Sequence, residues 1–254
     1  FSGTGGALIV DLSSTGDQVT MFNGLANSVS QSGFEDVDAS SYTQTGSVGA
    51  DITGSSGANV IVGTGYADTI RGGDGADTIT GGAGNDTVIG GAGIDNYKFS
   101  DTNGKDTITF VRNEDLLDFS AVTAQGTIAE ASITNDAGTT LGATTLTSNT
   151  TIYYIDTDAT EMGTATATSV TDYTSTTAIA TWMNLDDGIV AGDTANDTNY
   201  FVINDADDTD AAYVIKHTDD GDGTITIEAS ELEIIAVINS SVAGAIDAND
   251  GVIA

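Results

Sequence analysis

The sequence predicts an all-β protein: a parallel β-roll, which is a short β-solenoid, and a β-rich C-terminal region that contains one short helix. Residues 54–98 repeat glycine, an acid and an apolar residue at a period of nine, which indicates stacked turns and short strands. Elsewhere, short β-type runs alternate with turns rich in glycine, serine and asparagine. We divide the chain into an irregular β-solenoid flank (1–53), the roll with its cap (54–120) and the C-terminal region (121–254).

The repeat segment reads GSSGANVIV, GTGYADTIR, GGDGADTIT, GGAGNDTVI and GGAGIDNYK. Position one is always glycine, which marks backbone with a positive φ or a close neighbour. Position eight is always large and apolar, from Ile61 to Tyr97. Each repeat is therefore predicted to be a tight acidic turn followed by a three-residue strand whose middle side chain points inward. A flexible Gly/Asp-rich linker is the alternative, but a linker has no reason to keep an apolar residue at every ninth place.

Position six carries an acid or its amide in every repeat. Two nonapeptides make one coil of a roll, so residues eighteen apart should stack on two edges: Asn59, Asp77 and Asp95 on one, Asp68 and Asp86 on the other. Bare carboxylates stacked at the ~4.8 Å strand spacing repel one another, and a hard dication between them turns the repulsion into coordination. Calcium takes about 6–8 oxygens, which carboxylates and turn carbonyls can jointly supply. We predict several Ca²⁺ ions as the cofactor.

The predicted ligand set extends beyond position six. Asp74 adds an acid in one turn, although its carbonyl is an equal candidate. The segment 104–109 repeats half of the nonapeptide after a two-residue insertion and adds Asp106. The complete set of predicted calcium ligands is Asn59, Asp68, Asp77, Asp86, Asp95, Gly72, Asp74, Gly81, Gly90, Asp106, Asp220 and Asp222.

The last two of these ligands lie in an acidic loop that resembles an EF-hand loop. Aligning its D-G-D-G-x-I core puts Thr218 first and Ala229 last, where an EF-hand has Asp and a bidentate Glu. Calcium binding at this loop is one hypothesis. The other is a plain acidic hairpin turn between strands at 212–217 and 224–228.

The roll is predicted to extend past the nonapeptides on both sides. Ile52 lies nine residues before Ile61, so the coil should continue upstream. Strands at 107–110 and 116–120 would close the other end, because a solenoid needs a cap over its last apolar layer.

The charge of the chain excludes whole classes of partner. It has 38 acidic and 5 basic residues, a formal net charge of −33. With no basic patch to neutralise phosphates, we predict no nucleic-acid partner, and anionic membranes are equally disfavoured. The longest apolar run, around 233–238, is too short to insert across a bilayer. So many carboxylates oppose a compact state, and without cysteine no disulfide can hold it, so we expect a chain that folds only with its cations.

The C-terminal region has no period of its own. Three runs are predicted strands, at 151–155, 199–203 and 212–215, and 232–238 is a final strand or buried segment. Residues 178–185 could form one short helix with its apolar face on the sheet.

No group of residues in the sequence predicts catalysis. His217 is the only histidine, and the chain has no H-E-x-x-H, G-x-S-x-G or phosphate-binding glycine loop. Pairs of carboxylates are expected by chance among 38 acids. We therefore predict that the chain is not an enzyme.

The nonapeptides resemble those of the RTX (hemolysin-type) calcium-binding repeat family. The resemblance implies secretion through an uncleaved C-terminal signal of the type I route. The family's strand and L-D-x-S sequel is similar to Asp106–Phe110 and Leu117–Ser120, although its usual glycine is replaced by 111–114. The chain opens at Phe1 without an initiator methionine or signal-peptide pattern, so we expect a fragment, a processed form or a protein exported by another signal.

The C-terminal region resembles that of RTX-type bacterial S-layer proteins, which pair a tryptophan-bearing helix with two strands. Here these parts correspond to 178–182, 198–205 and 212–216. The resemblance implies a calcium-dependent structural protein at the bacterial cell surface, an S-layer subunit or fragment that self-assembles into sheets or filaments. Cell-surface polysaccharide is a further candidate partner. The alternatives are the C-terminal end of a large RTX adhesin and the non-catalytic tail of an RTX protease or lipase.

Overall fold

The computed structural model describes residues 3–16, 18–22, 25–26, 34–44, 46–101, 103–111, 114–122, 129–133, 144–145, 151–155, 175–185, 189–190, 198–204, 211–219, 227–240 and 252–253. The chain forms two compact units. The first contains residues 1–122 and 250–253, and the second contains residues 123–249. The division of the chain into flank, roll and C-terminal region stays a prediction.

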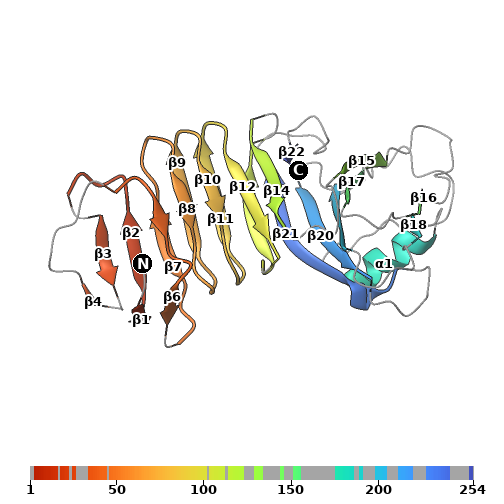
Figure 1. Cartoon of the computed structure of the whole chain (residues 1–254), viewed down its shortest axis with the longest axis horizontal. Helices are drawn as coiled ribbons and strands as arrows, with labels where there is room; N and C mark the ends of the chain where they lie inside the picture. The colour runs from red at the N-terminus through yellow and green to blue at the C-terminus, as the bar shows by residue number, and fades with distance from the viewer. Residues whose placement is uncertain are drawn as a thin grey trace. The chain divides into compact units, whose positions relative to one another are not determined.

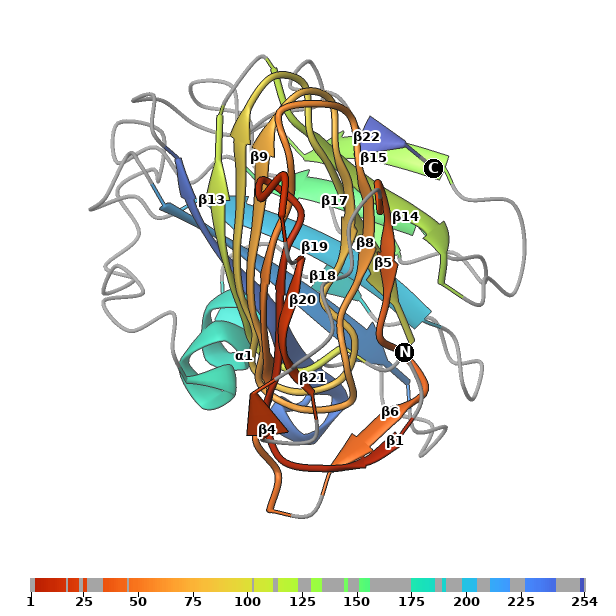
Figure 2. The same cartoon turned by 90° about the vertical axis from the view of Figure 1, so that its left-hand side faces the viewer.

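The first unit is a parallel β-solenoid, which confirms the predicted all-β fold (Figure 1). Successive strands of the coils belong alternately to two sheets, and Figure 2 shows the strands of successive coils lying behind one another. One sheet contains β2 (Leu8–Asp11), β7 (Ala50–Thr53), β9 (Thr69–Asp74), β11 (Thr87–Ala92) and β13 (Asp106–Phe110). The other contains β5 (Val37–Asp38), β8 (Val60–Val62), β10 (Thr78–Thr80), β12 (Asn96–Ser100), β14 (Leu116–Ala121) and β22 (Val252–Ile253).

The strand register confirms the predicted stacking of residues eighteen apart. Ile79 of β10 pairs with Ile61 of β8 on one side and with Tyr97 of β12 on the other. The next coil lies twenty residues on, since Tyr97 pairs with Leu117 and Val88 pairs with Ile108. The two-residue insertion is therefore absorbed in the turns, and the solenoid continues for about four turns.

The position-eight side chains form the core of the roll. Ile61, Ile70, Ile79, Val88 and Tyr97 are all buried, as the alternating strand pattern predicts. Ile52 pairs with Ile70 and is also fully buried, which confirms that the coil runs upstream of the nonapeptides.

Aromatic side chains close the last coils of the roll. Phe99 and Phe119 stack with their ring centroids 4.8 Å apart, and Phe110 lies 6.1 Å from the ring of Tyr97. All four rings are buried, and each is worth about 1.5–3 kcal/mol of apolar burial. The segment predicted to cap the roll is thus its last coil, formed by β13 and β14.

The N-terminal flank adds short, irregular strands to the first coils. β2 pairs in parallel with β7, while β3 (Val19–Phe22) and β4 (Leu25–Ala26) continue the same sheet in antiparallel fashion. β1 (Gly3–Gly5) pairs with β6 (Tyr42–Gln44) in a separate two-stranded sheet. The buried amide of Gln18 joins the loops, because it donates to the carbonyl of Leu12 and accepts the N–H of Phe34.

The second unit mixes parallel and antiparallel pairing. β15 (Ala129–Ile133), β17 (Thr151–Ile155) and β19 (Thr198–Asn204) are parallel, and β19, β20 (Ala211–Thr218) and β21 (Leu232–Ser240) are antiparallel. The unit also contains the helix α1 (Thr176–Leu185), the 3₁₀ turn η1 (Ala229–Glu231) and a two-stranded pair, β16 (Thr144–Thr145) with β18 (Ile189–Val190).

The predicted elements of the C-terminal region are present, with one correction. The strands at 151–155, 199–203 and 212–215, the helix at 178–185 and the final strand at 232–238 all form. The predicted strand at 224–228 was wrong where it can be assessed, since Ile227 and Glu228 are not in a strand. β20 pairs instead with β19 on one side and with β21 on the other.

Candidate calcium-binding turns

The position-six side chains lie inside the turns of the roll. Asn59, Asp68, Asp77, Asp86 and Asp95 are between 0% and 2% exposed, although four of the five are acids. Charged side chains are buried to this degree only when they are paired, hydrogen-bonded or bound to a metal ion. Their surroundings therefore decide what the turns can bind.

A ladder of hydrogen bonds runs along each edge of the roll. On one edge, the N–H groups of Asn59, Asp77 and Asp95 donate to the Oδ1 atoms of Asp77, Asp95 and Asp115 over 2.8, 3.0 and 3.0 Å. On the other, Asp68 and Asp86 donate to Asp86 and Asp106 over 2.8 and 3.0 Å. Each acid thus uses one oxygen to fix the preceding coil, through a charge-assisted bond when it is ionised.

Asp115 belongs to this ladder but was not among the predicted ligands. It is fully buried, and it lies twenty residues after Asp95, as Asp106 lies twenty after Asp86. Applying the same two-residue shift to the second half of the coil would have identified Asp115 from the sequence. The bulky Leu117 two residues later completes the position-six to position-eight spacing.

Three acids in the middle of the roll keep a second oxygen without a hydrogen-bond donor. The Oδ2 atoms of Asp77, Asp86 and Asp95 are buried and have no hydrogen-bond partner in the part of the chain that the structure describes. Leaving a buried acceptor unsatisfied costs about 1–3 kcal/mol, and more for a charged group. Three such atoms in consecutive turns indicate a missing positive partner.

A carbonyl oxygen converges with one of these atoms beside Gly72. A Cβ atom on Gly72 would lie 2.3 Å from Oδ2 of Asp77 and 2.4 Å from the carbonyl oxygen of Gly90 in the next coil. No side chain fits there, and both neighbours are acceptors. Calcium binds carboxylate and carbonyl oxygens at about 2.3–2.6 Å, so the residues present fit this ion.

The corresponding glycines of the next two turns face their own acids. A Cβ on Gly81 would lie 2.3 Å from Oδ2 of Asp86, and one on Gly90 would lie 2.1 Å from Oδ2 of Asp95. The hydroxyl of Tyr97 also approaches Gly90 and accepts its N–H at 3.0 Å. Asp77, Asp86 and Asp95 would therefore supply the carboxylate ligands, and the ion would supply the positive charge that these turns lack.

Burial raises the pKa of the stacked carboxyls in the calcium-free chain. Desolvation is the main cause, and it brings the pKa to about 6 for Asp95, about 7 for Asp86 and about 8 for Asp106. The charges of neighbouring acids raise these pKa values further, and the backbone N–H bonds of the ladder oppose the rise. At neutral pH these turns therefore hold charge poorly unless a cation compensates it.

The donor set suits a hard cation rather than zinc. Within the described ranges, no group of three or more His, Cys, Asp or Glu side chains is placed to hold one metal ion. The turn at Gly72 instead offers a single carboxylate together with a backbone carbonyl. Such oxygen sets are typical of calcium, whereas zinc prefers clustered His and Cys ligands.

The remaining predicted ligands differ in what the structure says of them. Asp74 is exposed on the outside of its turn. Burial is the main cause that raises the pKa of Asp77, and the charge of Asp74 raises it further. Asp106 is buried at the end of its ladder. Asp220 and Asp222 lie outside the described residues. The ligand role of every predicted residue stays a prediction.

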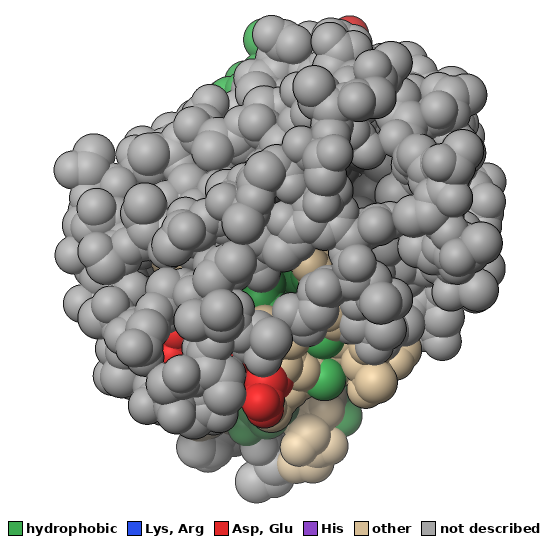
Figure 3. Space-filling model, turned by 90° about the vertical axis from the view of Figure 1, so that its right-hand side faces the viewer, with side chains coloured by type: hydrophobic (Ala, Val, Ile, Leu, Met, Phe, Trp, Pro, Cys, Tyr) green, Lys and Arg blue, Asp and Glu red, His purple; other side chains and the backbone are tan. Residues whose placement is uncertain are grey.

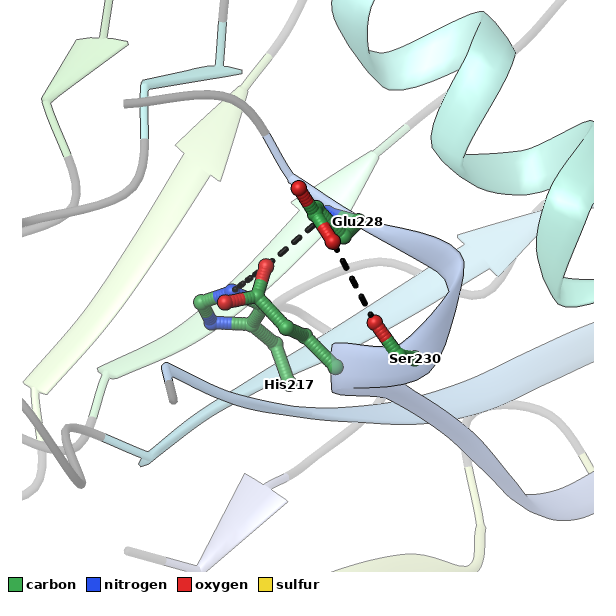
Figure 4. Close-up of polar contacts among 4 residues, drawn as sticks. His217, Glu228 and Ser230 are labelled. Carbon is green, nitrogen blue, oxygen red and sulfur yellow. Dashed lines mark hydrogen bonds and ion pairs between the residues drawn. The ribbon is translucent and has the colours of Figure 1, made fainter. Parts of the chain in front are cut away.

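A second buried polar group lies in the C-terminal unit. Nε2 of His217 on β20 is 3.5 Å from Oε2 of Glu231 in η1, and both side chains are buried (Figure 4). Glu231 also accepts the N–H of Glu228 at 2.8 Å, while Ser230 contacts the Glu228 carboxylate. This contact joins η1 to β20.

One basic side chain on the outside of the roll is paired with an acid. Arg71 is already paired with Asp51 at 3.1 Å. Figure 3 shows acidic and hydrophobic side chains beside one another where described residues reach that face. In the same described part of the chain, no helix is long and apolar enough to cross a membrane.

Comparison with known families agrees with the geometry of the turns. Residues 53–88 and 62–97 match the family model of the RTX calcium-binding nonapeptide repeat, which contains four copies of the repeat. The chain therefore carries RTX-type repeats, which are calcium-binding motifs, over the segment that forms the central coils. Proteins with such repeats are generally secreted. No curated protein matches the chain.

Proposed function

We propose that the chain is a non-enzymatic, extracellular structural protein whose β-roll folds when calcium binds and which then self-assembles at a bacterial cell surface. One observation carries the calcium part: three consecutive turns bury a carboxylate oxygen that has no donor among the described residues. Calcium would satisfy these oxygens and reduce the repulsion within a net charge of −33.

Calcium-dependent folding also suits an exported protein. A ligand that binds only the folded chain stabilises it by an amount that grows with ligand concentration. Extracellular calcium sites with a Kd of roughly 10⁻⁴–10⁻³ M stay unfilled in a calcium-poor cytosol and fill outside the cell. The chain has no cysteine, so calcium would take the part that disulfides play in other secreted proteins.

The folding part of the proposal is tested by far-UV circular dichroism during a calcium titration. We expect the β structure of the roll to be missing in chelator and to form cooperatively as calcium reaches millimolar levels, with magnesium at the same ionic strength as the control. A chain that is already fully folded in chelator would refute the proposal that calcium drives folding.

The assembly part of the proposal rests on the resemblance of residues 178–182, 198–205 and 212–216 to the C-terminal region of S-layer proteins. We expect millimolar calcium to produce ordered sheets or filaments in negative-stain electron microscopy, and chelator to dissolve them. A chain that stays monomeric at high protein and calcium concentration would argue against an S-layer subunit. It would favour the end of an RTX adhesin, or the tail of an RTX protease or lipase.

A further inference from the structure

The turns of the roll differ at position two, the residue that follows the first glycine. The first two repeats have Ser55 and Thr64 there, whereas the next three have glycine. The last coil has Val111 at the corresponding place, four residues before the buried acid Asp115. This difference coincides with a difference in how the position-six side chain is satisfied.

A residue other than glycine at position two directs its N–H at the position-six side chain of the same turn. Ser55 donates to Oδ1 of Asn59 over 2.7 Å, and Val111 donates to Oδ2 of Asp115 over 2.7 Å. Thr64 donates to Oδ2 of Asp68, and its hydroxyl adds a 2.8 Å bond to Oδ1. We call these three turns closed, because protein donors satisfy their position-six oxygens.

A glycine at position two leaves the position-six oxygen without this donor. Gly73, Gly82 and Gly91 have φ values of +115°, +107° and +118°, a region that other residues rarely adopt. The sign of φ sets the direction of the N–H relative to the chain that follows it. These three open turns are those in which Oδ2 of Asp77, Asp86 and Asp95 is buried without a hydrogen-bond partner among the described residues.

The glycine conformation is also enforced by the neighbouring coil. A Cβ on Gly73 would lie 2.1 Å from the carbonyl oxygen of Ser55, and one on Gly82 would lie 2.1 Å from that of Thr64. The tight stacking of an open turn on the preceding coil therefore requires glycine at position two. Sequence and conformation are linked at this one residue.

We propose that the residue at position two decides whether a turn binds calcium. The three open turns bind calcium through Asp77, Asp86 and Asp95, and the closed turns of Asn59, Asp68 and Asp115 complete themselves with protein hydrogen bonds. The ion-requiring turns thus occupy three consecutive repeats, which follow the closed turns of Asn59 and Asp68 and precede the closed turn of Asp115. This inference rests on the proposed calcium-dependent folding and goes further by dividing the position-six residues into two classes.

Two matched substitutions at position six test this division. Asp68→Asn should leave the calcium stoichiometry unchanged and the affinity within about twofold, because the first repeat already combines Asn59 with a position-two hydroxyl. Asp77→Asn should lose one bound ion or weaken calcium binding at least tenfold, which is about 1.4 kcal/mol. Isothermal titration calorimetry on the full chain measures both. Equal losses in the two variants would overturn the inference.

Substitutions at position two test whether a closed turn can be made to bind calcium. Thr64→Gly removes the hydroxyl and permits a positive φ, so it should open the turn of Asp68 and add one bound calcium ion per chain. Thr64→Ser keeps the hydroxyl and should bind the same number of ions as the unchanged chain. If Thr64→Gly gains no ion although circular dichroism shows that it folds in calcium, position two does not control binding.

The results separate this inference from the proposed function. If the unchanged chain binds no calcium, the proposed function fails and this inference falls with it. If the unchanged chain binds calcium but Asp68→Asn and Asp77→Asn behave alike, only the division into open and closed turns fails. Hydrogen–deuterium exchange of both variants in calcium confirms that any lost ion is not the result of a lost fold.

Discussion

The two compact units differ in what they do with buried polar groups. The roll stacks like side chains at the same place in every coil, so its acids accumulate along two edges, with each Oδ1 bound to the coil before. The β19–β20–β21 sheet pairs unlike residues, such as Phe201 with Ile215 and Tyr200 with Lys216. Its buried glutamate, Glu231, faces a histidine instead of another acid.

This difference follows from the direction of pairing. A parallel solenoid with a fixed period places identical residues one above another, which strengthens an apolar core but also stacks like charges. An antiparallel meander has no such period, so each buried polar group can be given its own partner. We therefore expect the roll to depend on an external ion and the sheet of β19, β20 and β21 to fold without one.

The largest effect on stability is expected when one buried aromatic side chain is truncated in each unit. Phe119→Ala and Phe201→Ala each remove a fully buried ring and should cost about 3–5 kcal/mol of unfolding free energy. Urea denaturation in millimolar calcium measures that cost. Only Phe119→Ala should also raise the calcium concentration needed for folding, because Phe119 packs in the last coil against Phe99. An equal shift in both variants would show that the two units fold as one.

A smaller effect is expected from glycine substitutions within the roll. Gly75 has a φ of +108°, and a Cβ there would lie 2.7 Å from the backbone of Gly57, so Gly75→Ala should cost at least about 2 kcal/mol. Gly57 is at the same position of the preceding coil, and a Cβ there would meet only the hydroxyl of Ser55 at 3.8 Å. Gly57→Ala should therefore change stability by less than about 0.5 kcal/mol. Thermal unfolding in calcium compares the two variants, and similar losses would show that the close approach of Gly75 to the preceding coil does not require glycine.

The smallest expected effect is the response of the roll to pH. The pKa values of Asp86 and Asp95 are raised to about 7 and about 6 in the folded, calcium-free chain, above the unfolded value of about 3.9. The folded state therefore binds protons more strongly, so protonation stabilises it fully below the unfolded pKa, and this stability is lost as the pH rises from there through the folded pKa values of about 6–7. The calcium-free roll should gain β structure on acidification, while the calcium affinity falls by up to about tenfold per pH unit. Circular dichroism in chelator at pH 5 and pH 8 tests the first part, and more β structure at pH 8 would contradict it.

The roll was predictable because its sequence is periodic. The spacing of nine gave the turns, the inward apolar residues and the stacking by eighteen, and even the insertion before Asp106 was visible. Asp115 keeps the spacing of nine from Asp106 and was missed because its own turn has no glycines. The roles of Ser55 and Thr64 could not be predicted, since they depend on the direction of a single N–H in three dimensions.

The C-terminal unit was predictable only at the level of single elements. Apolar runs located β17, β19, β20 and β21, and a helical pattern located α1. The partner of β20 was misplaced because pairing in an aperiodic sheet depends on tertiary contacts and not on local sequence. The contact of His217 with Glu231 joins two elements that no motif links, so the sequence offered no signal for it.

Hydrogen–deuterium exchange with and without calcium tests most directly whether the ion requirement belongs to the open turns. We predict that in chelator the amides of residues 72–97 exchange rapidly while those of β19, β20 and β21 stay protected. Millimolar calcium should then protect 72–97 with little change in the C-terminal sheet. Protection of 72–97 that is the same with chelator and with calcium would contradict the account, because the buried oxygens of Asp77, Asp86 and Asp95 would then need no ion.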